Sequence, residues 1–221
     1  MSQFAPVEQL FSANSKWAAD VSKFEPNFFP ECAKGQTPKV LWIGCADSRV
    51  PETTITGARP GEIFVHRNIA NQFHPDDDSV LSVLTYAVDF LGVEHVVIVG
   101  HTECGGAMAC HGASASVVPG QSVTTIPSLP TDDPINRWLQ PLTTLAASLQ
   151  ISSAPPAEAV SVLVEENVKQ QVRNLAQTQV IVNAWQNKSK KGKDVWIHGW
   201  VYDLAQGKLK DLRVSQGPKV A

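Results

Sequence analysis

Two stretches decide the fold of this chain: residues 40–49, VLWIGCADSR, and residues 96–106, VVIVGHTECGG. Each is an apolar run, rich in β-branched residues, that ends in side chains able to bind a metal. Apolar runs of this kind, flanked by glycine, are typical of parallel strands that are buried on both faces. Because ligands of open α/β sheets bind beyond the carboxyl ends of the strands, we expect Cys45, His101 and Cys104 to meet at one edge of a sheet.

Two thiolates and one imidazole are a typical ligand set for zinc. Structural zinc sites close with four protein ligands, whereas catalytic sites use three and keep one position open, so this set favours catalysis. The alternative is two buried structural cysteines with a capping histidine, because free cysteine is often buried. We predict that Cys32 and Cys110 serve packing, although Cys110 lies close enough to Cys104 in the sequence to act as a fourth ligand.

The composition bounds the class of protein. The 221 residues, with a formal net charge of −3 from 18 basic and 21 acidic residues, predict one domain with a sizeable core. No basic stripe indicates a nucleic-acid partner, and no apolar run of about 18 residues predicts a membrane span. The first residues lack the pattern of a secretory signal, and four cysteines suit a reducing compartment better than a disulfide framework. We therefore expect a cytoplasmic protein.

The pattern along the chain predicts a single domain over residues 1–221, with an N-terminal helical arm at 1–35 and a core at 36–214. The predicted fold class is α/β, a mainly parallel sheet flanked by helices, with the zinc site at the carboxyl ends of the strands. A helix over 7–24, cut off by Pro26 and Pro30, could cap its own core or lie on a partner subunit. Beyond the two opening runs, the core patterns predict strands at 61–68, 196–202 and 209–214, helices at 80–91, 135–149 and 157–186, and a surface loop at 111–131.

Asp47 and Arg49 lie two residues apart beyond the first strand, a spacing that allows a bidentate ion pair. On an open surface such a pair contributes only about 0–1 kcal/mol. Beside a dication, Arg49 would hold the Asp47 carboxylate as an acceptor for a proton of metal-bound water. Without the arginine, Asp47 is itself a good fourth ligand. The pair therefore predicts a switch between a closed site, with the carboxylate on the metal, and an open one.

Gly105 and Gly106 follow the last ligand at a predicted helix start. Their backbone N–H groups would form a pocket that favours anions. The alternative is a tight turn that only glycine fits, and both can hold together.

CADSR at residues 45–49, with HTECGG at 101–106, resembles the β-class carbonic anhydrases. The resemblance extends through GEIFVHRNIAN at 61–71 and HGWVYD at 198–203, and it covers the core from about Gln36 to Val214. It implies a carbonate dehydratase, a zinc enzyme with one Zn²⁺ per chain that interconverts carbon dioxide and bicarbonate. It also implies a homodimer as the smallest working unit, often paired into a tetramer.

The resemblance places zinc on Cys45, His101 and Cys104, and the catalytic dyad on Asp47 and Arg49. In the mechanism that this implies, zinc lowers the pKa of its bound water, and the resulting hydroxide attacks carbon dioxide. The dyad then either orients the hydroxide or gates the fourth zinc position.

Further residues match the substrate site of the family. Gln36 matches the glutamine that hydrogen-bonds substrate or bicarbonate, and Gly105 and Gly106 would steady the nascent bicarbonate. The apolar wall around carbon dioxide, partly supplied by the neighbouring subunit, matches three residues that could equally be ordinary core: Phe64, Ile69 and Tyr86. His111 is a candidate proton relay.

Trp42, Arg67 and Tyr202 match the residues that hold a non-catalytic bicarbonate in the allosteric bacterial branch of the family. Arginine can clamp the anion, with the tyrosine and the indole as donors. Trp42 and Tyr202 are also plausible core aromatics, so the branch stays open. Two other classes of protein compete with the enzyme: a bicarbonate or carbon dioxide sensor with Asp47 permanently on zinc, and a structural zinc protein with Cys110 as fourth ligand.

Overall fold

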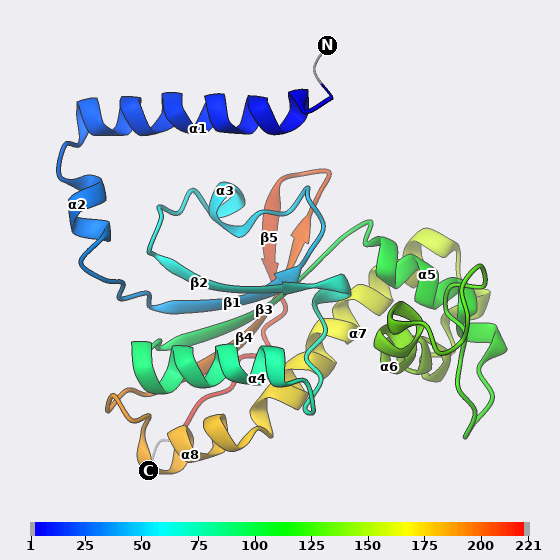
Figure 1. Ribbon diagram of the computed structural model, residues 1–221. Coiled ribbons are helices and arrows are strands. Elements are labelled where there is room, and N and C mark those ends of the chain that lie inside the picture. Colours follow the sequence, from blue (N-terminus) through cyan, green and yellow to red (C-terminus); the bar gives the residue numbers. More distant parts are fainter. Residues whose placement is uncertain (1–2, 219–221) are drawn as a thin grey trace. The chain divides into compact units, whose positions relative to one another are not determined.

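The computed structural model describes residues 3–218 and divides into two compact units, residues 1–37 and residues 38–221 (Figure 1). The first unit contains α1 (Ala5–Phe24) and α2 (Phe28–Cys32). The two helices contact each other through the rings of Trp17 and Phe29, which meet edge to face with centroids 5.4 Å apart. The helix predicted for 7–24 is therefore confirmed. Within the described residues of this unit neither helix has a buried side chain, and α1 exposes large apolar groups that include Leu10 and Phe11.

The prediction that Cys32 serves packing is wrong. Cys32 ends α2 and is exposed. A helix of five residues that buries none of them offers no interior for a thiol.

The second unit is built on one five-stranded sheet in the order β2-β1-β3-β4-β5. Its strands are β1 (Val40–Cys45), β2 (Ile63–Asn68), β3 (His95–His101), β4 (Trp196–Asp203) and β5 (Lys208–Asp211). The first four are parallel and β5 is antiparallel. The mainly parallel sheet predicted from the apolar runs is confirmed. The last strand ends earlier than predicted, because the Asp211 carboxylate accepts a hydrogen bond from the backbone N–H of Arg213, whose positive φ of 56° turns the chain away.

Helices cover one face of the sheet and bury its apolar side chains. Leu41 and Ile43 of β1 pack with Ile98 of β3 in a core shared with α4 (Asp78–Thr85), α7 (Pro156–Ala176) and α8 (Gln179–Asn187), which lie on that side in Figure 1. On the opposite face Trp42, Val97 and Val99 form a smaller cluster that includes a side chain of α3 (Glu52–Thr56). The flanking helices predicted for the sheet are thus confirmed.

The helices differ from the predicted ranges at two places. The helix predicted at 157–186 is two helices, because the buried Thr178 hydroxyl donates to the Leu175 carbonyl and so replaces a helix hydrogen bond. The predicted loop at 111–131 begins later, since α5 (Gly105–Ala113) continues into a 3₁₀ turn at Ser114–Ser116. The predicted helix at 80–91 runs through α4 and a π-helical turn (Tyr86–Leu91) to Gly92, which is left-handed as a helix stop requires.

The remaining elements are α6 (Pro134–Ser148), close to the predicted 135–149, and short 3₁₀ turns at Ile69–Asn71 and Ile151–Ser153. α6 packs on α5 beyond the carboxyl ends of the strands (Figure 1). Within residues 3–218, no helix combines the length and the apolar character needed to cross a membrane.

Candidate metal centre

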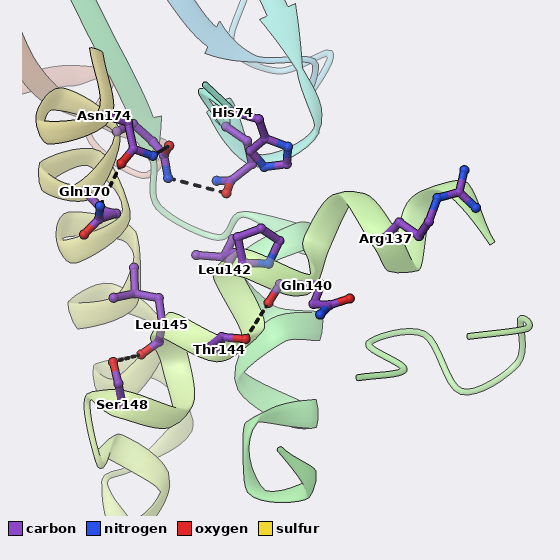
Figure 2. Close-up of a pocket in the computed structure, with 12 residues that line it drawn as sticks. His74, Arg137, Gln140, Leu142, Thr144, Leu145, Ser148, Gln170 and Asn174 are labelled. Carbon is purple, nitrogen blue, oxygen red and sulfur yellow. Dashed lines mark hydrogen bonds between the residues drawn. The ribbon is translucent and has the colours of Figure 1, made fainter. Parts of the chain in front are cut away.

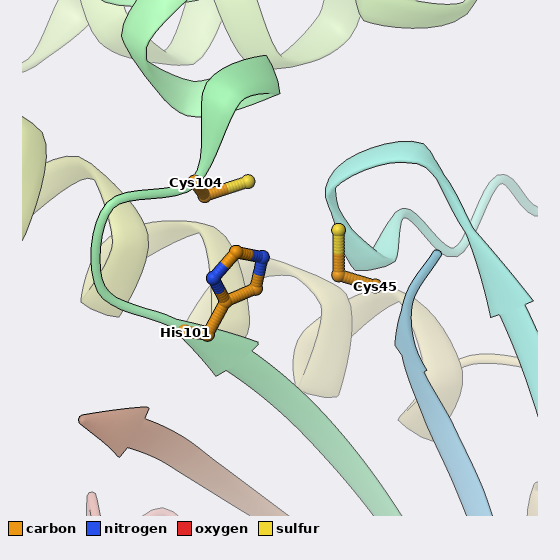
Figure 3. A group of neighbouring side chains, drawn as sticks. All are labelled: Cys45, His101 and Cys104. Atoms are coloured by element: carbon orange, nitrogen blue, oxygen red, sulfur yellow. The ribbon is translucent and has the colours of Figure 1, made fainter. Parts of the chain in front are cut away.

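Three predicted ligands meet at the carboxyl edge of the sheet. Cys45 ends β1, His101 ends β3, and Cys104 caps the start of α5 (Figure 3). All three are buried, and their ligand atoms lie within 4.8 Å of one another. In the part of the chain that the structure describes, this is the one group of three such side chains close enough to hold a metal ion. The fold brings them together because β1 and β3 are neighbours in the sheet.

The imidazole of His101 is oriented for coordination. Its Nδ1 donates to the Thr102 carbonyl at 2.8 Å, which fixes the proton on that nitrogen. Its Nε2 is buried and has no hydrogen-bond partner within residues 3–218. A buried acceptor without a partner is costly, so a cation at this nitrogen would satisfy it.

The two thiols divide their protons unequally. The contact with the Cys104 thiol, and after it the neighbouring His101 ring, lowers the pKa of Cys45 well below its usual value, against the effect of burial. The hydrogen bond to Cys45 and burial raise the pKa of Cys104, which the backbone amides of Ala107 and Gly106 partly offset. For His101, burial alone would lower the pKa, but the contact with Cys45 raises it overall. One thiolate, one thiol and a free imidazole nitrogen at this separation fit a zinc ion that replaces the shared proton.

Cys110 does not join the ligands. Its sulfur is buried and lies 3.8 Å from the Leu139 carbonyl, and burial raises the pKa of its thiol to about 11. The packing role predicted for Cys110 fits this position, and a fourth-ligand role does not.

Asp47 and Arg49 form the predicted bidentate ion pair. Arg49 Nε donates to Asp47 Oδ1 at 3.0 Å and Nη2 donates to Oδ2 at 2.6 Å, while the Arg49 backbone N–H donates to Oδ1 at 2.9 Å. These bonds hold the pKa of the Asp47 carboxyl far below its usual range. Asp47 Oδ2 lies 3.9 Å from His101 Nε2, so the carboxylate borders the metal ligands while the arginine holds it. The gating role of the pair stays a prediction.

The segment after β3 enters α5 through a tight path. Glu103 is left-handed, with φ of 55°, and its carbonyl accepts a hydrogen bond from Arg49 Nη2 at 3.0 Å. A Cβ at Gly106 would lie 3.0 Å from the Ala70 Cβ, whereas one at Gly105 would meet nothing within 4 Å. The close approach to Ala70 therefore explains why residue 106 is glycine, but it does not explain the glycine at residue 105. The Gly106 amide is directed at the Cys104 sulfur.

Only one residue of the predicted apolar wall lies near these ligands in a single chain. Ile69 directly follows Asn68, the register partner of Cys45, and is 42% exposed. Phe64 pairs with Leu41, four residues or about 13 Å further back along the strands. Its ring stacks on Tyr86 at 5.9 Å, and Tyr86 is 47% exposed. Gln36 belongs to the first compact unit.

Arg67 holds the end of β1, a role that the sequence pattern did not indicate. Its Nε donates to the Cys45 carbonyl at 2.7 Å, and its Nη2 donates to the Asp47 carbonyl at 2.5 Å. Trp42 is buried in the smaller cluster. The Tyr202 hydroxyl lies 3.7 Å from where a Cβ at Gly207 would be, in the turn after β4. The role of the three residues in bicarbonate binding stays a prediction.

Three cavities of residues 3–218 have walls that contain none of the three metal ligands. One of about 540 Å³ opens between α6 and α7 and carries amide and hydroxyl side chains (Figure 2). A second, of about 560 Å³, reaches Ala46 and Ile69. A third, of about 370 Å³, includes Glu103 and His111, the candidate relay.

The parallel sheet, the Cys-His-Cys ligands at its carboxyl edge and the bordering carboxylate define a zinc-enzyme architecture of the α/β class. The carbonic anhydrase family pattern matches residues 40–209. A carbonic anhydrase of Emericella nidulans is 36% identical over 94% of this chain and 84% of its own length. Among solved structures, the β-carbonic anhydrase CafA of Aspergillus fumigatus has a TM-score of 0.79 and 38% identity, covering 96% of this chain and 92% of that one. A tetrameric β-carbonic anhydrase of Sordaria macrospora has a TM-score of 0.79 and 35% identity, covering 96% and 99%.

The chain belongs to the β-class carbonic anhydrases. The family and the zinc cofactor expected from the sequence are thereby confirmed.

Proposed function

We propose that this chain catalyses the reversible hydration of carbon dioxide to bicarbonate and a proton, with zinc on Cys45, His101 and Cys104. The observation that carries the proposal is a buried ligand group with a partnerless imidazole nitrogen, bordered by a carboxylate 3.9 Å away. When bound, zinc would lower the pKa of a water molecule towards neutrality and so supply a nucleophile. Family membership supports the same reaction.

Asp47 would act as a hydrogen-bond acceptor and not as a ligand. Arg49 occupies Oδ1 through two donors and Oδ2 through one, so Oδ2 keeps acceptor capacity towards the centre. Its lowered pKa keeps the carboxylate ionised across the neutral range. In this role Asp47 orients the water for attack and Arg49 keeps the carboxylate off the metal. The same pair would gate the centre if Asp47 left the arginine for the open position.

The substrate pocket would be assembled from two copies of the chain. In one chain Phe64 and Tyr86 lie far back along the sheet and expose an aromatic edge that includes Phe90, which is 57% exposed. That edge supports a homodimer in which one subunit adds Phe64, Tyr86 and Gln36 to the wall near Ile69 of the other. The apolar face of α1 would pack on the partner. The Sordaria relative is described as tetrameric, which supports a dimer of dimers here.

Sedimentation velocity tests the assembly. We expect a dimer or tetramer, and replacing Leu10 and Phe11 of α1 with Ser should lower the stability of the assembly towards dilution. Replacing Lys16 and Lys23, which are also exposed on α1, with Ser is the matched control. A fully active monomer would contradict this part of the proposal.

Three finer assignments remain proposals. Trp42, Arg67 and Tyr202 would bind a regulatory bicarbonate, and His111 would relay the proton. The amides of Gly105 and Gly106 would steady bicarbonate. A cytoplasmic setting is supported by four cysteines that are all free thiols. A part in carbon utilisation would follow from the proposed reaction.

Stopped-flow carbon dioxide hydration between about pH 7 and 9, which spans the ionisation of zinc-bound water, tests the reaction. We expect activity that rises with pH. A sensor with Asp47 permanently on zinc would show none at any pH, and so would a structural zinc protein. Cobalt-substituted protein separates these two, because its absorption reports whether two or three thiolates bind.

A further inference from the structure

One face of α7 holds the loop that follows β2. This loop, residues 69–73, is called the Ile69 loop below. The amide side chains of Asn167, Gln171 and Asn174 lie four and three residues apart, the spacing of neighbours on one helix face. Asn167 and Gln171 are buried, and each of the three donates to or accepts from a residue of this loop.

Asn167 binds the middle of the loop. Its Nδ2 donates to the Ala70 carbonyl at 3.0 Å, and its Oδ1 accepts from Gln72 Nε2 at 2.8 Å. The same Gln72 nitrogen also donates to the Ala70 carbonyl at 2.8 Å. Two buried amides therefore converge on one carbonyl.

Gln171 and Asn174 bind the end of the loop. The backbone N–H of Phe73 donates to Gln171 Oε1 at 3.0 Å, and the Phe73 carbonyl accepts from Asn174 Nδ2 at 3.1 Å. Gln171 Nε2 donates to Asn167 Oδ1 at 2.8 Å, which links the two buried amides on the helix. These bonds replace the sheet pairing that the loop backbone lacks.

The loop needs this support because its backbone is strained. Ala70 and Asn71 are consecutive left-handed residues, with φ of 59° and 47°. Residues with a Cβ disfavour this conformation, and it persists only where the surroundings over-determine it.

The Ile69 loop touches both segments that carry metal ligands. The Asn68 carbonyl, just before it, accepts a hydrogen bond from the backbone N–H of Ala46 at 2.8 Å, next to Cys45. On its other side Ala70 packs against Gly106, two residues after Cys104. The loop therefore sets the position of Ile69 relative to both segments.

We infer that Asn167 and Gln171 are positioning residues for the reaction, because they hold the Ile69 loop in its left-handed form beside the metal centre. The inference rests on the proposed function, in which Ile69 forms part of the wall around carbon dioxide. It predicts that loosening α7 from the loop weakens the capture of carbon dioxide more than the chemical step.

The test compares Gln171→Met with Gln170→Met in the zinc-loaded protein. Gln170 precedes Gln171 on α7, and its Nε2 donates to Asn174 Oδ1 at 2.8 Å in the cavity wall of Figure 2. Its hydrogen bonds run to Asn174 and Arg173 and not to the Ile69 loop. In Gln171→Met the Phe73 amide loses its acceptor, so we expect its hydrogen exchange to accelerate by about 10-fold or more. The KM for carbon dioxide should rise by about 10-fold, since a small displacement of a positioned wall is that costly, with kcat within about 3-fold.

Gln171→Glu keeps the acceptor for Phe73 but loses the donor to Asn167 Oδ1, so it should recover part of the exchange protection and of the KM. Asn174→Ala removes the bond to the Phe73 carbonyl together with the bonds to Gln170 and Gln171, and it serves as a milder variant if Gln171→Met does not fold. Unchanged exchange in Gln171→Met, or in Asn174→Ala where Gln171→Met does not fold, overturns the inference, and so does accelerated exchange with an unchanged KM. If the wild-type protein does not hydrate carbon dioxide, the proposed function fails instead, and hydrogen exchange alone decides whether α7 holds the loop.

Discussion

The carboxyl ends of β1 and β3 each deliver a ligand to the metal centre, but the chain leaves the two strands in different ways. After Cys45 it runs into a charged segment, where the guanidinium of Arg49 grips the Asp47 carboxylate with bonds of 2.6 and 3.0 Å. After His101 it turns through a left-handed residue into α5, where Gly106 packs against the Ile69 loop. One end is arranged by charge and the other by packing.

The two ends are also tied together by arginines. Arg67 binds the carbonyls of Cys45 and Asp47, and Arg49 reaches the Glu103 carbonyl at 3.0 Å. Each arginine thus satisfies backbone carbonyls beyond the sheet. The comparison shows that a metal ligand can be positioned either beside a charged pair or by packing alone. Variants at the two ends should therefore affect metal binding, catalysis and stability separately.

The largest effect should be the loss of zinc when a ligand is replaced, and it should be equally large at the two ends. Cys45→Ser and Cys104→Ser should each lower the zinc content from about one per chain towards zero, because a hydroxyl stays protonated at neutral pH and is a poor ligand. Metal analysis after gel filtration measures this. Cys110→Ser, which alters a buried thiol outside the ligand group, should keep its zinc. Stoichiometric zinc in Cys45→Ser would refute the assignment.

The next effect should belong to the β1 end alone. Arg49→Ala frees Asp47 to take the open position, so activity should fall while zinc stays bound. Asp47→Ala should lose the oriented acceptor, typically a 10²–10⁴-fold effect on rate. The double variant should be no worse than the worse single one, because both residues act through one step.

Lys39→Ala is the control for the charge change. Lys39 forms an exposed ion pair with Glu94, also at 2.6 Å, away from the metal ligands. Its replacement should therefore leave the rate nearly unchanged. Stopped-flow rates and zinc content are the measurements. A crystal structure of the Arg49→Ala protein with Asp47 still off the zinc would contradict the switch.

Variants at the β3 end should mainly change the free energy of unfolding. Gly106→Ala places a Cβ 3.0 Å from that of Ala70 and 3.4 Å from Ile69 Cγ2, so the free energy of unfolding should fall by about 1–3 kcal/mol, as overpacking does. Gly105→Ala meets nothing within 4 Å and should change it by about 0.5 kcal/mol or less. Urea unfolding compares the two. Equal losses at both glycines would show that packing does not distinguish them.

These two ends were predictable from sequence to different depths. Cys45, His101 and Cys104 could be placed because each follows an apolar run whose period and composition fix a strand. The Asp47–Arg49 pair could be placed because its partners are two residues apart. The role of Arg67 could not be predicted in this way. Its hydrogen bonds to the end of β1 join residues that are 20 and 22 positions apart in the sequence, and a local sequence pattern does not reveal such pairs.

The features that the sequence missed or predicted wrongly also depend on contacts between distant residues. Asn167 and Gln171 look like ordinary polar positions of a helix, yet they are buried because their partners lie more than 90 residues away in the Ile69 loop. Cys32 was expected to pack because thiols usually do, but its short helix has no interior. The break at Thr178 depends on one side-chain hydrogen bond that competes with a continuous helical pattern. Local periodicity predicts elements, whereas burial of polar groups depends on tertiary partners.

The smallest expected effect extends the comparison to the two ends of β3, which begins and ends with a histidine. His101 faces thiols, whereas His95 Nδ1 lies 3.1 Å from His198 Nε2, and His198 Nδ1 lies 2.8 Å from Ser215 Oγ. Burial, followed by the neighbouring His95, lowers the pKa of His198. Its folded pKa is therefore below the unfolded value of about 6.5, and the unfolded chain binds the proton more readily.

The contribution of His198 to stability is thus present above about pH 6.5 and lost as the pH falls through that value towards the lower folded pKa. His198→Asn keeps a polar group between His95 and Ser215 but cannot be protonated, so it should lose less stability than the wild type between pH 7 and pH 5. Urea midpoints of both zinc-loaded proteins at the two pH values measure the difference. Acid release of zinc affects both alike and cancels, and burial of His66 and His74, which also lowers their pKa values, leaves some acid sensitivity in the variant. Equal losses in the two proteins would mean that the histidine pair accepts a proton in the folded state as readily as in the unfolded chain.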